Sequence, residues 1–205
     1  LKYIFNFKSI PKLVHRIDKD TSGLLLIAKD QISAKKISNL FKEHKIIKTY
    51  LAIVSPCPQN DSGLIDVPIL KKGVDGKQKM RVDYEKGKLS LTHYKVLDKV
   101  GSRVALVALY PKTGRTHQLR VHLEHINAPI VGDNKYKGLS GICNSSEKTN
   151  DHESISKIKW NAEDVNSLQL HAYCIRMPTN EIIEAGLNDE FKKNLNFLGL
   201  VLPKY

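Results

Sequence analysis

Three short segments of the chain contain the residue types that could do chemistry. The first, residues 15–23, reads HRIDKDTSG and directly precedes the apolar run 24–28. We expect this run to form a buried strand, which would hold the polar loop rigidly, as a catalytic group requires. The alternative is a capped turn in which Asp18 and Asp20 accept hydrogen bonds from backbone amides. The pattern alone leaves both interpretations open.

The second segment, residues 113–122, reads TGRTHQLRVH. If Thr116 caps a helix here, His117, Arg120 and Glu124 share one face of it. An arginine in the first helical turn opposes the helix dipole, so a fixed carboxylate partner would explain its position. The alternative is an ordinary Arg120–Glu124 pair at i, i+4, worth about 0.3–0.5 kcal/mol.

The third segment is the predicted strand 49–54, in which Tyr50 shares a face with Lys48. A half-buried strand aromatic is the alternative to an active-site tyrosine. A metal site is not expected, because His117, His122 and His125 lack the i, i+4 pair of a helical zinc site.

The elements around these segments alternate irregularly. We expect a helix capped by Asp30 and ending near His44, and a helix from Thr116 that stops at Asn127. A last helix should be capped by Asn188 or Asp189. The remaining expectations are a basic hairpin over 71–88, strands over 91–97, 104–110, 168–177 and 182–185, and a long surface excursion over 138–167. This order predicts the α+β class, with a mixed and mainly antiparallel sheet flanked by helices.

The composition indicates a globular protein and leaves two interpretations of its charge open: nucleic-acid binding, or a soluble protein with a basic pI. The 205 residues include 33 Lys and Arg against 21 Asp and Glu, which gives a net charge of +12. Residues 1–50 hold 11 basic and 4 acidic side chains, so the positive surface belongs largely to this part of the chain. If the charge serves binding, the expected partner is a polyanion, with nucleic acid as the first candidate. The three cysteines form no C-x-x-C pair, which favours a reducing, cytoplasmic location. No apolar run approaches the length of a membrane span.

Five motifs in order resemble the RluA family of RNA pseudouridine synthases. The stretch 64–69 and the long insertion before Leu168 resemble its large-subunit ribosomal RNA branch (RluC- and RluD-like members). Residues 15–25 resemble its H-R-L-D-x-x-T-S-G motif, with Ile17 in place of leucine. Residues 48–52 resemble its K-x-Y-x-A motif, and residues 114–122 its G-R-T-H-Q-L-R-V-H motif. Residues 128–133 resemble H-P-I-x-G-D with Ala128 in place of histidine, and residues 170–172 resemble L-H-A.

The resemblance implies a role for each matching residue. Asp18 matches the catalytic aspartate, Tyr50 the active-site tyrosine, and Arg120 the arginine that pairs with the aspartate. The implied RNA-contacting or substrate-binding residues are Arg16, His15, Thr21, Lys88, Arg115, His117, Gln118 and Leu170. Lys88 matches the lysine of a G-K-P segment, although Leu89 replaces the proline.

The resemblance also implies a pseudouridine synthase fold with a cleft, no cofactor and no metal. The whole of residues 1–205 would be one catalytic domain, incomplete at its N-terminus and acting as a monomer. The implied substrate is large-subunit ribosomal RNA, with transfer RNA as the alternative. Two other functions stay open from the residues: an inert RNA-binding factor on the same fold, which predicts a damaged site, and a metal-dependent nuclease, which needs clustered carboxylates.

Overall fold

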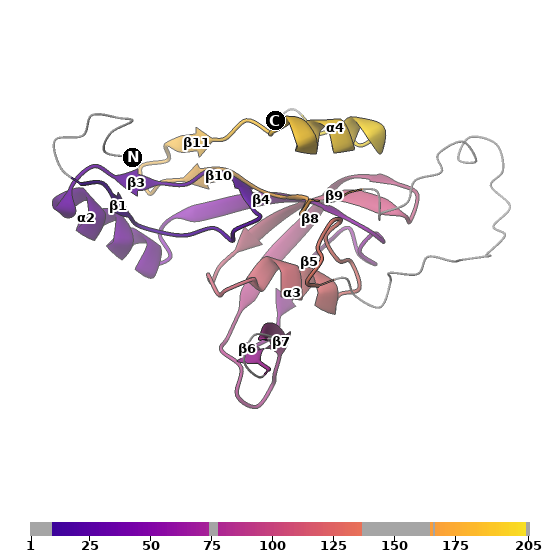
Figure 1. The fold of residues 1–205 in the computed structure, drawn as a ribbon, viewed down its shortest axis with the longest axis horizontal. Helices are drawn as coiled ribbons and strands as arrows, with labels where there is room; N and C mark the ends of the chain where they lie inside the picture. The colour runs from indigo at the N-terminus through magenta and orange to yellow at the C-terminus, as the bar shows by residue number, and fades with distance from the viewer. Residues whose placement is uncertain (1–9, 74–77, 137–164, 166, 204–205) are drawn as a thin grey trace, which may run out of the picture.

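A seven-stranded sheet forms the centre of the protein (Figure 1). The computed structural model describes residues 10–73, 78–136, 165 and 167–203. The strands lie in the order β11-β10-β4-β9-β8-β5, and β2 pairs with β10 off this path. Their bounds are β2 Ser22–Gly23, β4 Ile47–Val54, β5 Ser62–Asp66, β8 Leu91–Val100, β9 Val104–Pro111, β10 Leu170–Arg176 and β11 Ile182–Glu184. All pairs are antiparallel except β2 with β10, which confirms the predicted α+β class with a mixed, mainly antiparallel sheet.

The two faces of the sheet are covered by different helices, α3 (Gln118–His125) and α4 (Asp189–Phe197), which Figure 1 shows on opposite sides. In β4, Ala52 and Val54 belong to the core cluster that contains residues of α3. Leu51 and Ile53 belong to the cluster that contains Phe191 and Leu195 of α4. The alternation of side chains along a strand therefore places Tyr50, two residues before Ala52, on the α3 face.

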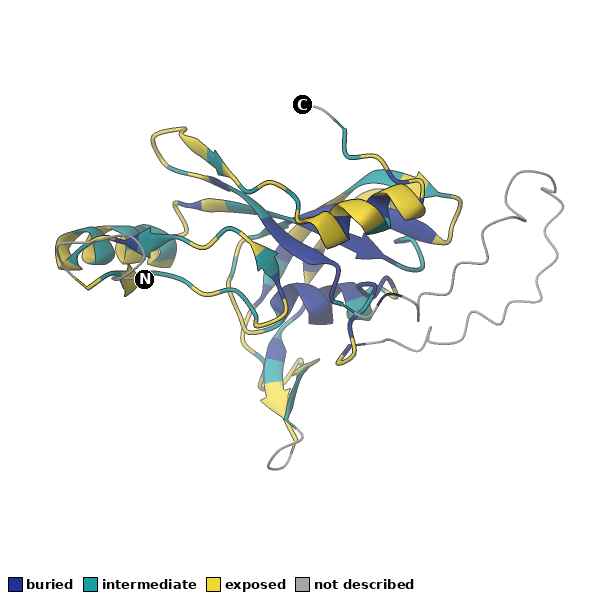
Figure 2. Ribbon diagram, turned by 45° about the horizontal axis from the view of Figure 1, so that its top comes forward, coloured by how far each residue is buried: buried dark blue, intermediate teal, exposed yellow. Residues whose placement is uncertain are grey.

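The helix caps show how local sequence starts two of the helices. Helix α2 (Gln31–Lys42) begins after Asp30, whose Oδ1 accepts a hydrogen bond from Ser33 N at 2.7 Å. Helix α4 begins after Asn188, whose Oδ1 accepts from Phe191 N at 2.8 Å. Both predicted caps are confirmed. Figure 2 shows that α3 is largely buried, whereas α2 lies at the outer end of the molecule with no fully buried residue.

Two local predictions are wrong. Residues 24–28 do not form one buried strand: β2 ends at Gly23, and β3 (Ile27–Ala28) pairs with β1 (Lys12–Leu13) in a separate sheet. Leu25 between them is 39% exposed. The chain turns at Gly23, whose φ is +103° and whose missing Cβ would lie 2.3 Å from the Ala172 carbonyl oxygen.

The predicted N-cap of α3 is also wrong. The cap is His117 with a left-handed φ of 51°, not Thr116, and its side chain makes no capping hydrogen bond. His117 therefore precedes the helix, and the prediction that it shares a helical face with Arg120 and Glu124 is wrong. Asn127, with φ of 57°, follows the helix at the predicted place.

The basic hairpin consists of β6 (Ile69–Lys72) and β7 (Lys79–Val82), and it projects away from the sheet (Figure 1). The surface excursion predicted over 138–167 lies outside the described residues except for two positions, Val165 and Ser167. Val165 is buried and packs in the cluster with α4. Within the described ranges, no helix is long and apolar enough to cross a membrane.

Candidate active site

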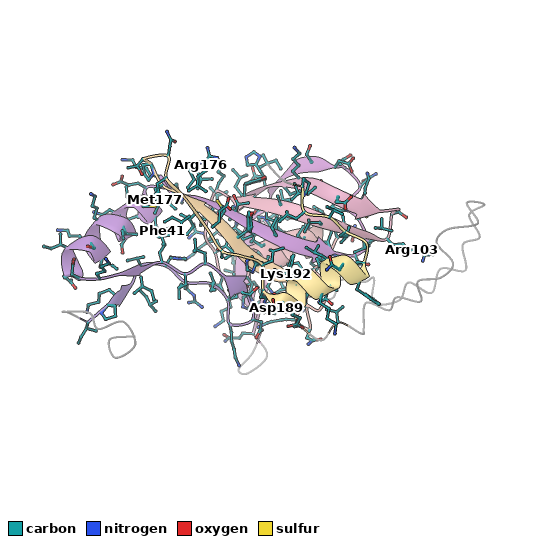
Figure 3. All side chains as sticks on the ribbon, turned by 90° about the horizontal axis from the view of Figure 1, so that it is seen from above. Phe41, Arg103, Arg176, Met177, Asp189 and Lys192 are labelled. Carbon is teal, nitrogen blue, oxygen red and sulfur yellow. The ribbon has the colours of Figure 1, made fainter. Side chains whose placement is uncertain are left out.

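A cleft of about 510 Å³ opens on the α3 face of the sheet, where the predicted site residues converge. Its walls come from the loop between β1 and β2, the end of α2, strand β4, the loop from β9 to α3, and the start of β10. Helix α2 contributes Phe41, which is labelled in Figure 3, and Lys42 to the wall of the cleft. Most of the predicted residues line this cleft: His15, Arg16, Asp18, Thr21, Tyr50, Arg115, His117, Gln118 and Leu170.

Asp18 lies in the loop between β1 and β2, half-buried in the wall of the cleft. A turn holds its backbone, because Thr21 N donates to the Asp18 carbonyl oxygen at 3.0 Å. Burial has the largest effect on the pKa values of Tyr50, His117 and Arg120, and it lowers the pKa of His117; the negative charge of Asp18 has a smaller effect in the raising direction on all three. The fold thus gathers around Asp18 residues that lie 32 to 102 positions away in the chain.

Tyr50 is positioned by the centre of the sheet. Its neighbours across the ladders are Ala172 of β10 and Leu109 of β9. Burial, with a smaller effect of the Asp18 charge, raises the pKa of the phenol to about 12. Tyr50 therefore carries its proton at neutral pH and can donate a hydrogen bond or act as a general acid, whereas it must first be deprotonated to act as a base.

Arg120 has a different carboxylate partner from the expected one. Its Nε and Nη2 donate to Asp133 Oδ2 and Oδ1, both at 2.7 Å, in a bidentate ion pair. No ion pair within 4.0 Å joins Arg120 to Asp18, and Glu124 pairs with Lys79. The prediction of a direct pair with Asp18 is therefore wrong in this structure. Burial lowers the pKa of Arg120, but the hydrogen bond and charge of Asp133 raise it more.

Tyr136 and Asp133 belong to the site, but the sequence pattern did not identify them. The Tyr136 hydroxyl accepts a hydrogen bond from Met80 N at 3.1 Å and lies 2.8 Å from His117 Nδ1. The guanidinium of Arg120 lies 5.0 Å from the centre of its ring. Asp133 stands in the matched motif 128–133 and could have been singled out, whereas Tyr136 lies outside the five motifs and carries no signal.

Gln118 faces the cleft with an amide that the protein already satisfies. Its Oε1 accepts from Thr113 Oγ1 at 2.7 Å and from Arg115 N at 3.0 Å. Its Nε2 donates to the Leu91 carbonyl oxygen at 3.0 Å and to Thr92 Oγ1 at 2.9 Å. Four hydrogen bonds occupy the amide fully. Gln118 therefore holds the loop before α3 in place, and the geometry argues against the predicted RNA contact.

The other predicted contacts differ in their exposure. Arg16 and Arg115 are exposed at the cleft. His15 stacks on Phe41 with ring centres 4.7 Å apart, and its Nε2 accepts from Leu26 N at 2.8 Å. Lys88 is exposed and pairs through its backbone with Ile69, but it is not among the residues that line the cleft.

Two predicted residues form a wall between β2 and β10. Leu170 is 2% exposed and Thr21 is 7% exposed. Because Ser22 lies opposite His171 in the parallel ladder, Thr21 lies beside Leu170. The Thr21 hydroxyl is buried without a hydrogen-bond partner. Such a group has an unmet hydrogen bond that a bound molecule could make.

Among the described residues, no group of three or more His, Cys, Asp or Glu side chains lies close enough together to hold a metal ion. The carboxylate of Asp133 already accepts hydrogen bonds from Arg120 and from the backbone amides of Lys135 and Tyr136. Of the described residues, Asp18 supplies the carboxylate and Tyr50 the phenol of the cleft lining, whereas the buried guanidinium of Arg120, held by Asp133, is not among the lining residues.

The chain is similar to proteins of known family. Two relatives are the ribosomal large subunit pseudouridine synthase C of Rickettsia conorii, 44% identical over 137 residues, and the synthase D of Borreliella burgdorferi, 41% identical over 142 residues. These matches cover 66% and 69% of this chain, but only 45% and 43% of the two relatives, so the matched region is less than half their length.

Two solved structures have the same fold. Human RNA Pseudouridylate Synthase Domain Containing 4 matches with a TM-score of 0.75 and 29% identity, covering 99% of this chain and 82% of that one. Human RNA Pseudouridylate Synthase Domain Containing 1 matches with a TM-score of 0.70 and 30% identity, covering 95% of this chain and 74% of that one. Residues 5–125 match the family described as RNA pseudouridylate synthase. The chain, with its cleft around Asp18, therefore belongs to the RNA pseudouridylate synthase family.

Proposed function

We propose that the protein converts uridine in large-subunit ribosomal RNA to pseudouridine, with Asp18 as the nucleophile. The observation that carries this proposal is the meeting of Asp18, Tyr50 and Leu170 in one cleft, from segments far apart in the chain. Family membership supports the reaction, and the names of the bacterial relatives support the substrate. Transfer RNA is the alternative substrate.

The reaction rearranges bonds within one nucleotide. The bond between uracil N1 and ribose C1′ breaks, the base rotates, and a new bond forms between C5 and C1′. The proton on C5 is lost and N1 gains one, so atoms and electrons balance without a redox partner. No cofactor and no metal are needed for these steps.

Each cleft residue has a part in this scheme. The ionised Asp18 carboxylate attacks either ribose C1′ or uracil C6, or assists a glycal route. Tyr50 stacks on the base, and its phenol, which carries a proton at neutral pH, donates that proton or a hydrogen bond. Leu170 provides the apolar wall against which the uracil packs. Arg120 acts at longer range, since its bidentate pair with Asp133 fixes a positive charge near Asp18.

The target base has to leave its stack to reach Asp18, at a cost of a few kcal/mol. The exposed Arg16 and Arg115 at the cleft are suited to bracing the vacated space and to binding phosphates. Thr21, His15 and His117 complete the proposed contacts around the nucleotide. Lys88, which lies away from the cleft, would contact RNA outside the target nucleotide. We further propose that the protein acts as a cytoplasmic monomer.

Pseudouridine mapping tests the proposal. Unmodified large-subunit ribosomal RNA and bulk transfer RNA are incubated with the protein, treated with a carbodiimide and read by primer extension. Stops at discrete uridines, lost with Asp18→Asn while RNA binding is retained, are the expected result. Binding without stops in either RNA would favour the inert RNA-binding factor, and stops that persist with Asp18→Asn would remove Asp18 from the nucleophilic role.

A further inference from the structure

Lys48 lies in the cleft but belongs to none of the groups assigned above. It stands two residues before Tyr50 on β4, so the two side chains share the face that opens into the cleft. Its ammonium lies next to the loop before α3, since a Cβ built on Gly114 would be 3.7 Å from Nζ. On the other side, the Lys48 charge acts on His15 and adds to the effect of burial in lowering the pKa of that histidine. Lys48 is therefore close to the loop of Gly114 and acts electrostatically on His15 in the loop between β1 and β2.

The charge of Lys48 has no counter-charge in the described part of the protein. Only two described lysines are partly buried, Lys48 and Lys79. Lys79 lies 3.4 Å from Glu124 and 4.6 Å from the centre of the Tyr136 ring. No carboxylate lies within 4.0 Å of Lys48 among the described residues, and burial lowers its pKa. A desolvated cation without a partner is unfavourable, so a bound anion would stabilise this position.

We propose that the Lys48 ammonium binds a backbone phosphate of the RNA strand that carries the target uridine, an inference that rests on the proposed function. A cleft of about 510 Å³ has the size of a small-molecule pocket and can hold a nucleotide with an adjoining phosphate. The charge that acts on Tyr50 comes from Asp18, whereas the charge of Lys48 acts on His15. Lys48 is thus placed to anchor the strand, and Asp18 and Tyr50 are placed to act on the base.

A chemical double-mutant cycle tests this contact. The probe is a synthetic hairpin from large-subunit ribosomal RNA that the chain binds, prepared with a neutral methylphosphonate at one linkage at a time. Dissociation constants are measured by filter binding for the wild type, Lys48→Met, Lys48→Gln and Lys48→Arg. Lys193→Met is the matched control, because Lys193 is an exposed residue of α4 on the opposite face of the sheet.

Lys48→Met and Lys48→Gln should each weaken binding about tenfold or more and reduce the salt slope by about one phosphate contact. Lys48→Arg should retain more affinity, and Lys193→Met should bind like the wild type. One methylphosphonate linkage should weaken the wild type but leave Lys48→Met unaffected. The melting temperature of Lys48→Met should equal or exceed that of the wild type, because an unpaired desolvated charge has been removed.

The contact is refuted if Lys48→Met and Lys48→Gln bind like the wild type, or if each neutral linkage weakens the wild type and Lys48→Met equally. A lower melting temperature with unchanged linkage dependence would show a structural lysine instead. These readouts need no turnover. If one neutral linkage weakens only the wild type, but the protein makes no pseudouridine, the Lys48–phosphate contact is supported and the proposed function is overturned.

Discussion

Replacing Asp133 with asparagine should destabilise the protein strongly, because it leaves the buried Arg120 charge without a counter-charge. The two side chains are 0% and 6% exposed and share two hydrogen bonds of 2.7 Å. Removing one partner from a buried ion pair costs about 3–5 kcal/mol. For a chain of this size that corresponds to a fall in melting temperature of about 6–20 °C. Thermal unfolding followed by circular dichroism measures the change.

A second substitution separates the charge effect from the loss of hydrogen bonds. Asp133 Oδ1 also accepts from Lys135 N and Tyr136 N, both at 2.9 Å, and the oxygen of an asparagine can keep those bonds. Adding Arg120→Met to Asp133→Asn removes the stranded charge and should recover part of the lost stability.

The matched control is Asp61→Asn, which breaks the exposed pair with Lys99. Its side chains are 67% and 48% exposed, so the loss should stay below about 1 kcal/mol. If Asp133→Asn lowers the melting temperature no more than Asp61→Asn, or if the double variant is less stable than the single one, the reasoning about the buried pair is wrong.

Three further predictions concern single groups. Tyr50→Phe keeps the ring but removes a phenol whose pKa is about 12, so turnover, measured by the release of the hydrogen on C5 as tritium from labelled RNA, should fall at least about tenfold; full activity would exclude the phenol as a proton donor. The buried hydroxyl of Thr21 has no hydrogen-bond partner in the free protein, so Thr21→Val should raise or preserve the melting temperature and lower kcat/KM. Thr21→Ser keeps the hydroxyl and should keep kcat/KM. A lower melting temperature of Thr21→Val with normal activity would contradict a substrate contact. His122 is 0% exposed, and burial lowers its pKa to about 4. As the pH falls from about 6.5, the unfolded state therefore takes up a proton that the folded state does not, and the free energy of unfolding should decrease by about 2 kcal/mol at pH 5. Urea unfolding at pH 7 and pH 5 should show this slope in the wild type and a weaker one in His122→Leu; equal slopes would exclude His122 as the source.

Local sequence patterns are sufficient to predict the elements whose signals lie within one segment. Asp30 and Asn188 cap their helices through hydrogen bonds to amides three residues on, and both lie inside a window that a sequence pattern covers. The alternation in β4 likewise placed Lys48, Tyr50 and Ala52 on one face. The motifs also led to Asp18 and Tyr50, which the structure brings into one cleft.

Contacts between groups that are distant in the chain become visible only in the folded protein. Arg120 pairs with Asp133 rather than with Asp18 or Glu124, because the turn after Asn127 brings residue 133 back against α3. Ser22 and Gly23, just before the run 24–28, pair with β10 about 150 residues further on, where Ser22 Oγ lies 2.8 Å from His171 Nδ1 and Leu24 N donates to the Ala172 carbonyl oxygen. Ile27 and Ala28, at the end of the run, pair instead with β1 in a separate sheet. Such contacts depend on which strands lie side by side. Burial of the whole core determines which strands pair, and the apolar pattern of a single segment does not predict it.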